Sequence, residues 1–116
     1  MFLPALSDIE ILLARLVAFE TTFATGTIAI TEFIEAWLDD HDVPHTRIDY
    51  ETGHKTNLFA TIGPDGPGGV VLSGHLDVVP VTGQNWASNP FELVRRNDRL
   101  FGRGTCDMKG FAAVAL

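Results

Sequence analysis

Residues 70–80 read VVLSGHLDVVP, and residues 102–110 read GRGTCDMKG. The first stretch opens with a continuous apolar run, 70–72, which is typical of a strand that is buried on both faces. The run leads directly into His75 and Asp77, which point to the same side of an extended chain because they are two positions apart. We therefore predict a buried strand that carries both side chains at its carboxyl end, where ligands of open α/β sheets gather.

The second stretch places Asp107 just before an apolar segment, 108–116, for which we predict a buried helix. Alone, Asp107 is typical of a helix cap, and His75 or Asp77 alone is typical of an ordinary surface or turn residue. Together they supply the nitrogen and oxygen donors that a borderline metal ion prefers.

The segments around these stretches predict an α/β fold in which helices flank a sheet. A Ser-x-x-Glu capping box opens the first apolar stripe at helical spacing, and a proline follows the second. Alternating and short apolar segments, separated by Gly, Pro, Asn and Asp, predict strands. The expected helices cover 7–19 and a segment that ends near 41, and the expected strands cover 46–50, 57–62, 91–94 and 100–101.

The composition limits the class of protein. With 116 residues, of which 46% are hydrophobic and 20% charged, the chain is typical of at most one globular domain. A net charge of −7 without clustered Lys and Arg argues against a nucleic-acid partner, and the apolar runs are too short for a membrane helix. The acidity favours solubility, although carboxylates also serve a cation. Cys106 is the single cysteine, which is compatible with a reducing cytoplasm.

Over its whole length the chain resembles the M20 family of metallopeptidases and deacylases. The resemblance is carried by HLDVVP at 75–80 and DMKGF at 107–111. Further features are most similar to the acetylornithine deacetylase branch of that family. They are Gly63-Pro64, the Gly-Gly turn at 68–69, Trp86 with Asn-Pro-Phe at 89–91, and LFGRG at 100–104.

The resemblance implies a zinc-exopeptidase-like catalytic domain with two Zn²⁺ ions, for which Co²⁺ is a possible substitute. His75 would be a ligand to one zinc, Asp107 would bridge both ions, and Asp77 would be the catalytic-site carboxylate that orients His75. The resemblance thus implies that His75 and Asp107 converge in space and form half of a metal cage. The implied reaction is metal-assisted hydrolysis of a small N-acyl amino acid, N2-acetyl-L-ornithine, to L-ornithine and acetate in arginine biosynthesis. The resemblance also implies a cytoplasmic homodimer without a nucleic-acid or membrane partner.

Part of the family's machinery has no counterpart in this sequence. In the family, the general base is the first of two adjacent glutamates that follow the bridging aspartate, whereas here no two glutamates are adjacent and none follows Asp107. Two ligands do not hold zinc tightly. We therefore expect residues 1–116 to be the N-terminal portion of the catalytic domain, without its remainder and the inserted dimerisation domain, and to be inactive alone.

Two alternatives to this interpretation remain open from the residues. The chain could come from another M20 enzyme, such as a succinyl-diaminopimelate desuccinylase, an aminoacylase or a carboxypeptidase, or it could be a non-catalytic module of the same fold. Cys106 is expected to be a small buried apolar residue, with a thiolate near a metal as the alternative.

Overall fold

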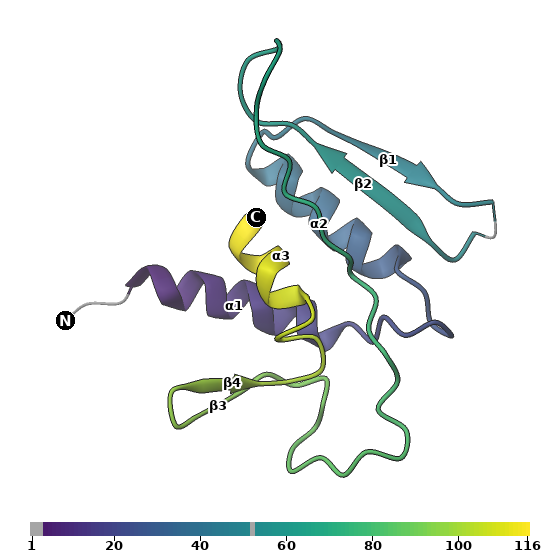
Figure 1. Cartoon of the computed structure of the whole chain (residues 1–116), viewed down its shortest axis with the longest axis vertical. Helices are drawn as coiled ribbons and strands as arrows, with labels where there is room; N and C mark the ends of the chain where they lie inside the picture. The colour runs from purple at the N-terminus through teal and green to yellow at the C-terminus, as the bar shows by residue number, and fades with distance from the viewer. Residues whose placement is uncertain (1–3, 52) are drawn as a thin grey trace.

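Helices and two small antiparallel sheets make up the computed structural model, which describes residues 4–51 and 53–116 (Figure 1). The coarse α/β prediction is confirmed. In chain order the elements are α1 (Pro4–Ala18), α2 (Ile28–Asp40), β1 (His45–Asp49), β2 (Thr56–Ala60), β3 (Val94–Arg96), β4 (Arg99–Phe101) and α3 (Lys109–Ala115). Within the described residues, no helix combines the length and the apolar character needed to cross a membrane.

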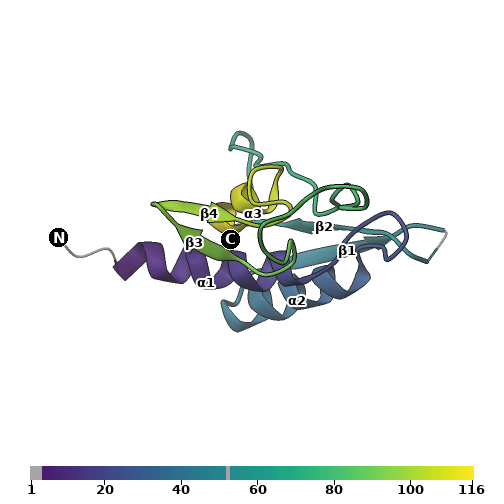
Figure 2. The ribbon, with the colours of Figure 1, turned by 90° about the horizontal axis from the view of Figure 1, so that it is seen from below.

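The core lies where the helices meet. Apolar side chains three and four positions apart on α1 face α2 and α3, and Leu16, Val17 and Ile30 are completely buried. Helix α3 packs on α1, and β2 packs on α2 (Figure 2). The buried cluster consists of Leu12, Leu13, Leu16, Val17, Ile30, Ile34, Leu38 and Ala113. Both helices predicted from periodicity are therefore present and bury the predicted faces.

Helix α1 begins at Pro4 and not at the predicted capping residue, Ser7. Proline is tolerated in the first turn of a helix because the first backbone N–H groups have no partner within the helix. Helix α2 ends at Asp40, one turn of chain before Pro44 and close to the predicted position. The capping-box pattern therefore identified the helix but missed its first residues.

The two strand pairs are separate hairpins. Strands β1 and β2 pair antiparallel with Thr46 opposite Phe59, and β3 and β4 pair with Val94 opposite Phe101. The second hairpin turns at Asn97 and Asp98, which both have positive φ, as a tight two-residue hairpin turn requires. The predicted strand at 91–94 reaches only Val94, because the Asn89 side chain accepts a hydrogen bond from the backbone N–H of Phe91 and forms a turn.

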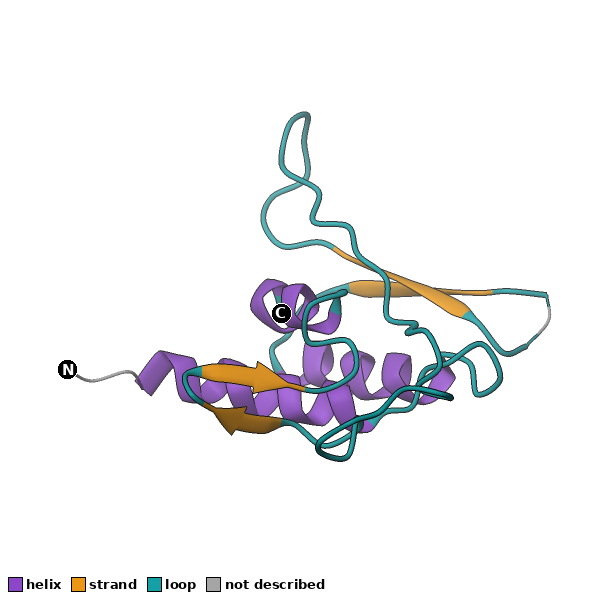
Figure 3. Ribbon diagram, turned by 60° about the horizontal axis from the view of Figure 1, so that its bottom comes forward, coloured by secondary structure: helices purple, strands orange, loops and turns teal. Residues whose placement is uncertain are grey.

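The predicted buried strand at 70–72 is wrong. Residues 70–80 form an extended loop that pairs with neither hairpin among the described residues (Figure 3). The side chains of Val70, Val71 and Leu72 are 87%, 79% and 63% exposed. A strand is buried on both faces only where strands flank it and helices cover both faces, and among the described residues no strand pairs with this segment. The expected single sheet flanked by helices is therefore not observed.

Helix α3 also differs from its prediction. It buries Lys109 and Ala113 against α1, whereas Phe111, Val114 and Leu116 remain exposed. Apolar side chains occur on nearly all sides of this helix, and among the described helices and strands α1 is its main packing partner. Burial of one face is what a single packing partner can provide.

Candidate functional site

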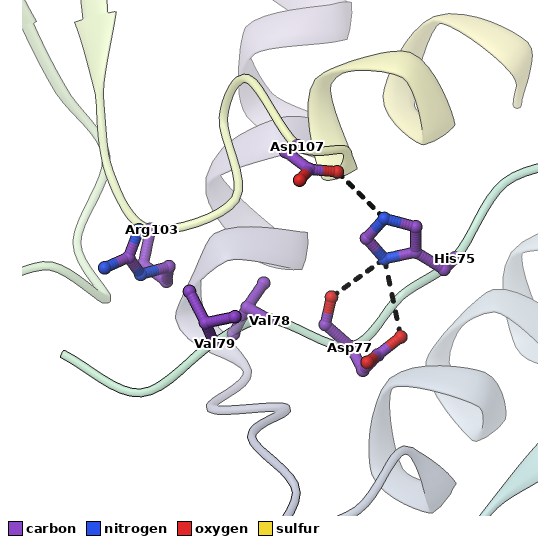
Figure 4. A pocket seen from close by; sticks show the side chains of 6 residues that line it. All are labelled: His75, Asp77, Val78, Val79, Arg103 and Asp107. Atoms are coloured by element: carbon purple, nitrogen blue, oxygen red, sulfur yellow. Dashed lines mark hydrogen bonds and ion pairs between the residues drawn. The ribbon is translucent and has the colours of Figure 1, made fainter.

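His75 and Asp107 face each other between the extended loop and the turn before α3, as the resemblance implied (Figure 4). His75 lies in the extended loop that follows β2, and Asp107 lies in the turn that leads into α3. Nε2 of His75 is 2.8 Å from Oδ1 of Asp107. Nδ1 of His75 is 3.0 Å from the backbone carbonyl oxygen of Asp77 and 3.4 Å from Oδ1 of the same residue. The structure thus brings together all three predicted site residues.

Both ring nitrogens of His75 face hydrogen-bond acceptors. A neutral imidazole carries one N–H, whereas the imidazolium carries two and can donate to both partners. Partial burial lowers the pKa of His75, but the hydrogen bonds to the Asp77 carbonyl and the Asp107 carboxylate, with the charges of both aspartates, raise it above 6.5 overall. The arrangement therefore favours the protonated, positively charged form of His75 beside Asp107.

A shallow pocket of about 110 Å³ surrounds this pair. Its lining consists of His75, Asp77, Val78, Val79, Arg103 and Asp107 (Figure 4). The side chains of His75 and Asp107 are 47% and 83% exposed, so solvent and solutes reach them freely. The described residues form an open rim and not an enclosed active site.

The loop that carries His75 is held by a residue that the sequence did not single out. Thr21, in the segment after α1, donates from Oγ1 to the carbonyl oxygen of Leu76 at 2.6 Å. The carbonyl oxygen of Thr21 accepts from the backbone N–H of Val78 at 2.9 Å. These two bonds lie on either side of Asp77 and fix the backbone from which His75 projects.

The turn that carries Asp107 is tied to the same part of the chain. Lys109 is completely buried, and its Nζ donates to the carbonyl oxygen of Phe19 at 2.7 Å. Burial lowers the pKa of Lys109 to about 8. The DMKGF motif contains Lys109 but does not indicate its structural role, and no local pattern marks Thr21, because their partners lie 90 and 55 positions away in the chain.

Arg103 is the remaining polar residue of the pocket that the sequence interpretation missed. Its guanidinium lies over the ring of Trp86, 5.3 Å from the ring centre, and donates a hydrogen bond to the Gln84 side chain. The same Gln84 oxygen accepts from Nε1 of Trp86 at 3.0 Å. Arg103 therefore fastens the loop that contains Trp86 to the edge of the site. Its place between two glycines next to the Asp107 turn was the signal available in the sequence.

The donors at this site fit zinc in kind but fall short in number. An imidazole nitrogen and a carboxylate oxygen are both zinc ligands, and zinc sites in proteins use three or four protein donors. Across residues 4–51 and 53–116, no group of three or more His, Cys, Asp or Glu side chains is placed to hold a metal ion. Cys106 does not add a buried donor. It is free and exposed, so its predicted burial is wrong, because the turn buries Gly104 and Lys109 and leaves Cys106 on its outer side.

The part of the chain that carries this site is similar to known proteins. Residues 71–116 match the sequence pattern of peptidase family M20/M25/M40. The acetylornithine deacetylase of Photorhabdus laumondii is 52% identical over 66 residues, which cover 57% of this chain and 17% of the relative. The acetylornithine deacetylase of Yersinia pseudotuberculosis is 38% identical over 99 residues, which cover 76% of this chain and 24% of the relative.

A third relative gives the same result. The acetylornithine deacetylase of Vibrio campbellii is 38% identical over 88 residues, which cover 76% of this chain and 23% of the relative. The chain thus spans about a fifth of the length of the curated relatives that it matches. The resemblance to the M20 family of hydrolases, and within it to acetylornithine deacetylases, is confirmed, and residues 71–116, with His75 and Asp107, carry the match to the family pattern.

Proposed function

We propose that residues 1–116 form the N-terminal portion of the catalytic domain of a zinc-dependent M20 amide hydrolase. The observation that carries this proposal is the 2.8 Å separation of His75 Nε2 and Asp107 Oδ1 inside the segment that matches the family. In the complete protein, the reaction would be hydrolysis of N2-acetyl-L-ornithine to L-ornithine and acetate, a step of arginine biosynthesis. The names of the relatives support this choice of substrate.

In this proposal, His75 and Asp107 would hold the metal, His75 as a ligand to one zinc and Asp107 as a ligand that two zinc ions share, and Asp77 would orient His75. When bound, zinc would supply Lewis-acid chemistry that polarises the amide carbonyl and lowers the pKa of water. The Asp77 carbonyl faces Nδ1 and thereby directs Nε2 towards Asp107. Because a ligating imidazole is neutral, His75 would have to release its second proton to hold a metal.

The complete protein would supply what these residues lack. It would add a third and fourth donor, a glutamate as general base, the strands that complete a sheet flanked by helices, and a dimerisation domain. We propose a cytoplasmic homodimer that acts on a small N-acyl amino acid, and an isolated 116-residue chain without activity. The coverage of 17–24% of the relatives' length supports this division of the machinery, and the free Cys106 is compatible with a reducing compartment.

Calorimetric titration of the chain with Zn²⁺ tests the ligand assignment. We expect weak binding that is lost in His75→Ala and in Asp107→Ala, because each change removes one of two donors. The matched control is His41→Ala, which removes an exposed imidazole at the end of α2. Zinc binding that survives His75→Ala but is lost in His41→Ala would remove His75 from the ligand set.

An activity assay of the full-length protein tests the substrate. We expect a higher kcat/KM for N2-acetyl-L-ornithine than for succinyl-diaminopimelate or for peptides. A preference for succinyl-diaminopimelate would assign the protein to the desuccinylases of the same family, which share the His75, Asp77 and Asp107 pattern.

A further inference from the structure

We infer that the short segment 19–21, directly after α1, is a common anchor that sets the separation of His75 and Asp107, with Thr21 and Lys109 as positioning residues. Two loops that are far apart in the chain carry the site, and both are hydrogen-bonded to this one segment. We call residues 74–78, which contain His75, the first arm, and residues 104–109, which contain Asp107, the second arm. The effect on metal binding rests on the proposed function, whereas the geometric part of the inference does not.

Thr21 holds the first arm by two bonds. Its side chain donates to the Leu76 carbonyl, and its own carbonyl accepts from Val78. Thr21 is 2% exposed, so its hydroxyl has no water to replace this partner. Residues 70–80 pair with no strand in the described part of the chain. The bonds to Thr21 therefore do the positioning that a strand ladder would otherwise do.

Lys109 holds the second arm. Its Nζ reaches the Phe19 carbonyl at 2.7 Å, and its backbone N–H donates to the Gly104 carbonyl at 2.8 Å. The first bond fixes the start of α3 against the end of α1, and the second closes the turn that contains Asp107. Because Phe19 and Thr21 are two positions apart on a segment that leaves a well-packed helix, the two arms share one reference point.

The two arms also touch each other at Gly104. A Cβ atom at this position would lie 2.9 Å from Cγ1 of Val78 and 3.1 Å from Cδ of Lys109, so only glycine leaves room for both. A second contact lies nearer the site. A Cβ atom at Gly74 would lie 3.1 Å from Cε of Met108. Movement of either arm would therefore change contacts that can be measured.

The test compares Thr21→Val, Thr21→Ser and Thr31→Val in the 116-residue chain. Valine keeps the shape of threonine and the backbone bond to Val78 but removes the hydroxyl donor, and serine restores the donor. Thr31→Val is the matched control, because Thr31 is also buried and donates to a backbone carbonyl, that of Thr27, at 2.8 Å within the α2 region. Both valine variants lose one buried hydrogen bond, and only one of them is next to the site.

Two readouts follow the arms. The first is the nuclear Overhauser effect between the Gly74 α-protons and the Met108 methyl group, and the second is Zn²⁺ affinity by calorimetry. We expect Thr21→Val to weaken the Gly74–Met108 signal and to lower zinc affinity by about tenfold, the effect typical of losing a supporting hydrogen bond around a metal ligand. Thr21→Ser should restore both, and Thr31→Val should leave both unchanged.

Unchanged Gly74–Met108 contacts and zinc affinity in Thr21→Val would overturn the inference. Weakened contacts in Thr21→Val, with zinc binding that does not depend on His75, would support the anchor and contradict the metal-centre proposal.

Hydrogen exchange of the backbone amides in the wild-type chain is a second test, and it does not require that any variant folds. The Val78 amide should exchange slowly although it lies outside any strand, and fast exchange at Val78 would overturn the anchor.

Discussion

His75 and Asp107 form an ion pair across 32 positions of the chain, with Nε2 2.8 Å from Oδ1. The hydrogen bonds to the Asp77 carbonyl and to Asp107 together raise the pKa of His75 above 6.5. An NMR titration of the metal-free chain should show this raised pKa, and Asp107→Asn should lower it. The raised pKa means that the pair stabilises the fold below pH 6.5, and that this contribution is lost as the pH rises through the folded-state value. Both side chains are too exposed for a large contribution. An unchanged His75 pKa in Asp107→Asn would contradict the ion pair.

Because the amine of Lys109 is buried, the stability of the chain should change with pH in the alkaline range. Burial lowers its pKa from 10.5 to about 8, so the unfolded chain binds more protons between these values. The free energy of unfolding should therefore rise with pH from about 8 to 10.5, by up to roughly 3 kcal/mol. Urea unfolding at several pH values measures this rise. Lys109→Met should abolish it, whereas Lys55→Met should retain it.

Leu16 tests the packing of α1. It is completely buried in the core between the helices, so Leu16→Ala should lower the free energy of unfolding by about 2–5 kcal/mol. Ile11 lies on the same helix but is exposed, and Ile11→Ala should change stability by about 0.5 kcal/mol or less. Equal losses in the two variants, measured by urea unfolding, would show that α1 does not bury the face described above.

Gly104 tests the contact between the two arms of the site. Gly104 and Gly83 both have positive φ, but a Cβ at Gly104 would press on Val78 and Lys109, whereas a Cβ at Gly83 meets nothing within 4 Å. Alanine at either position carries the same backbone strain. We expect Gly104→Ala to cost about 1–3 kcal/mol more than Gly83→Ala, because crowding is added only at Gly104. Thermal unfolding of the two variants measures the difference, and similar losses would contradict the close approach.

The sequence predicted those features that neighbouring residues determine. The helical stripes of α1 and α2 and the strands predicted at 46–50 and 57–62 depend on local periodicity and turn chemistry, and the structure contains them as α1, α2, β1 and β2. The convergence of His75 with Asp107 was expected from the resemblance to the M20 family, in which the corresponding residues share a metal centre, and not from local pattern.

Other features depend on partners far away in the chain. An apolar run such as 70–72 records a preference for burial, but the strands that would bury it are not specified by the run itself. Thr21 and Lys109 were missed for the same reason, since a threonine in a polar loop and a lysine at a helix start are ordinary residues until their distant carbonyl partners are known.

The exposed run at 70–72 has a consequence for the chain in concentrated solution. Three adjacent β-favouring or apolar side chains, on an extended segment that pairs with no strand of the described chain, offer a template on which other copies can add strands and aggregate. We expect light scattering to rise with chain concentration, and Val71→Lys to suppress this rise, because a charge on an open edge opposes stacking. The residues that lead into His75 therefore also limit how soluble the isolated chain can be.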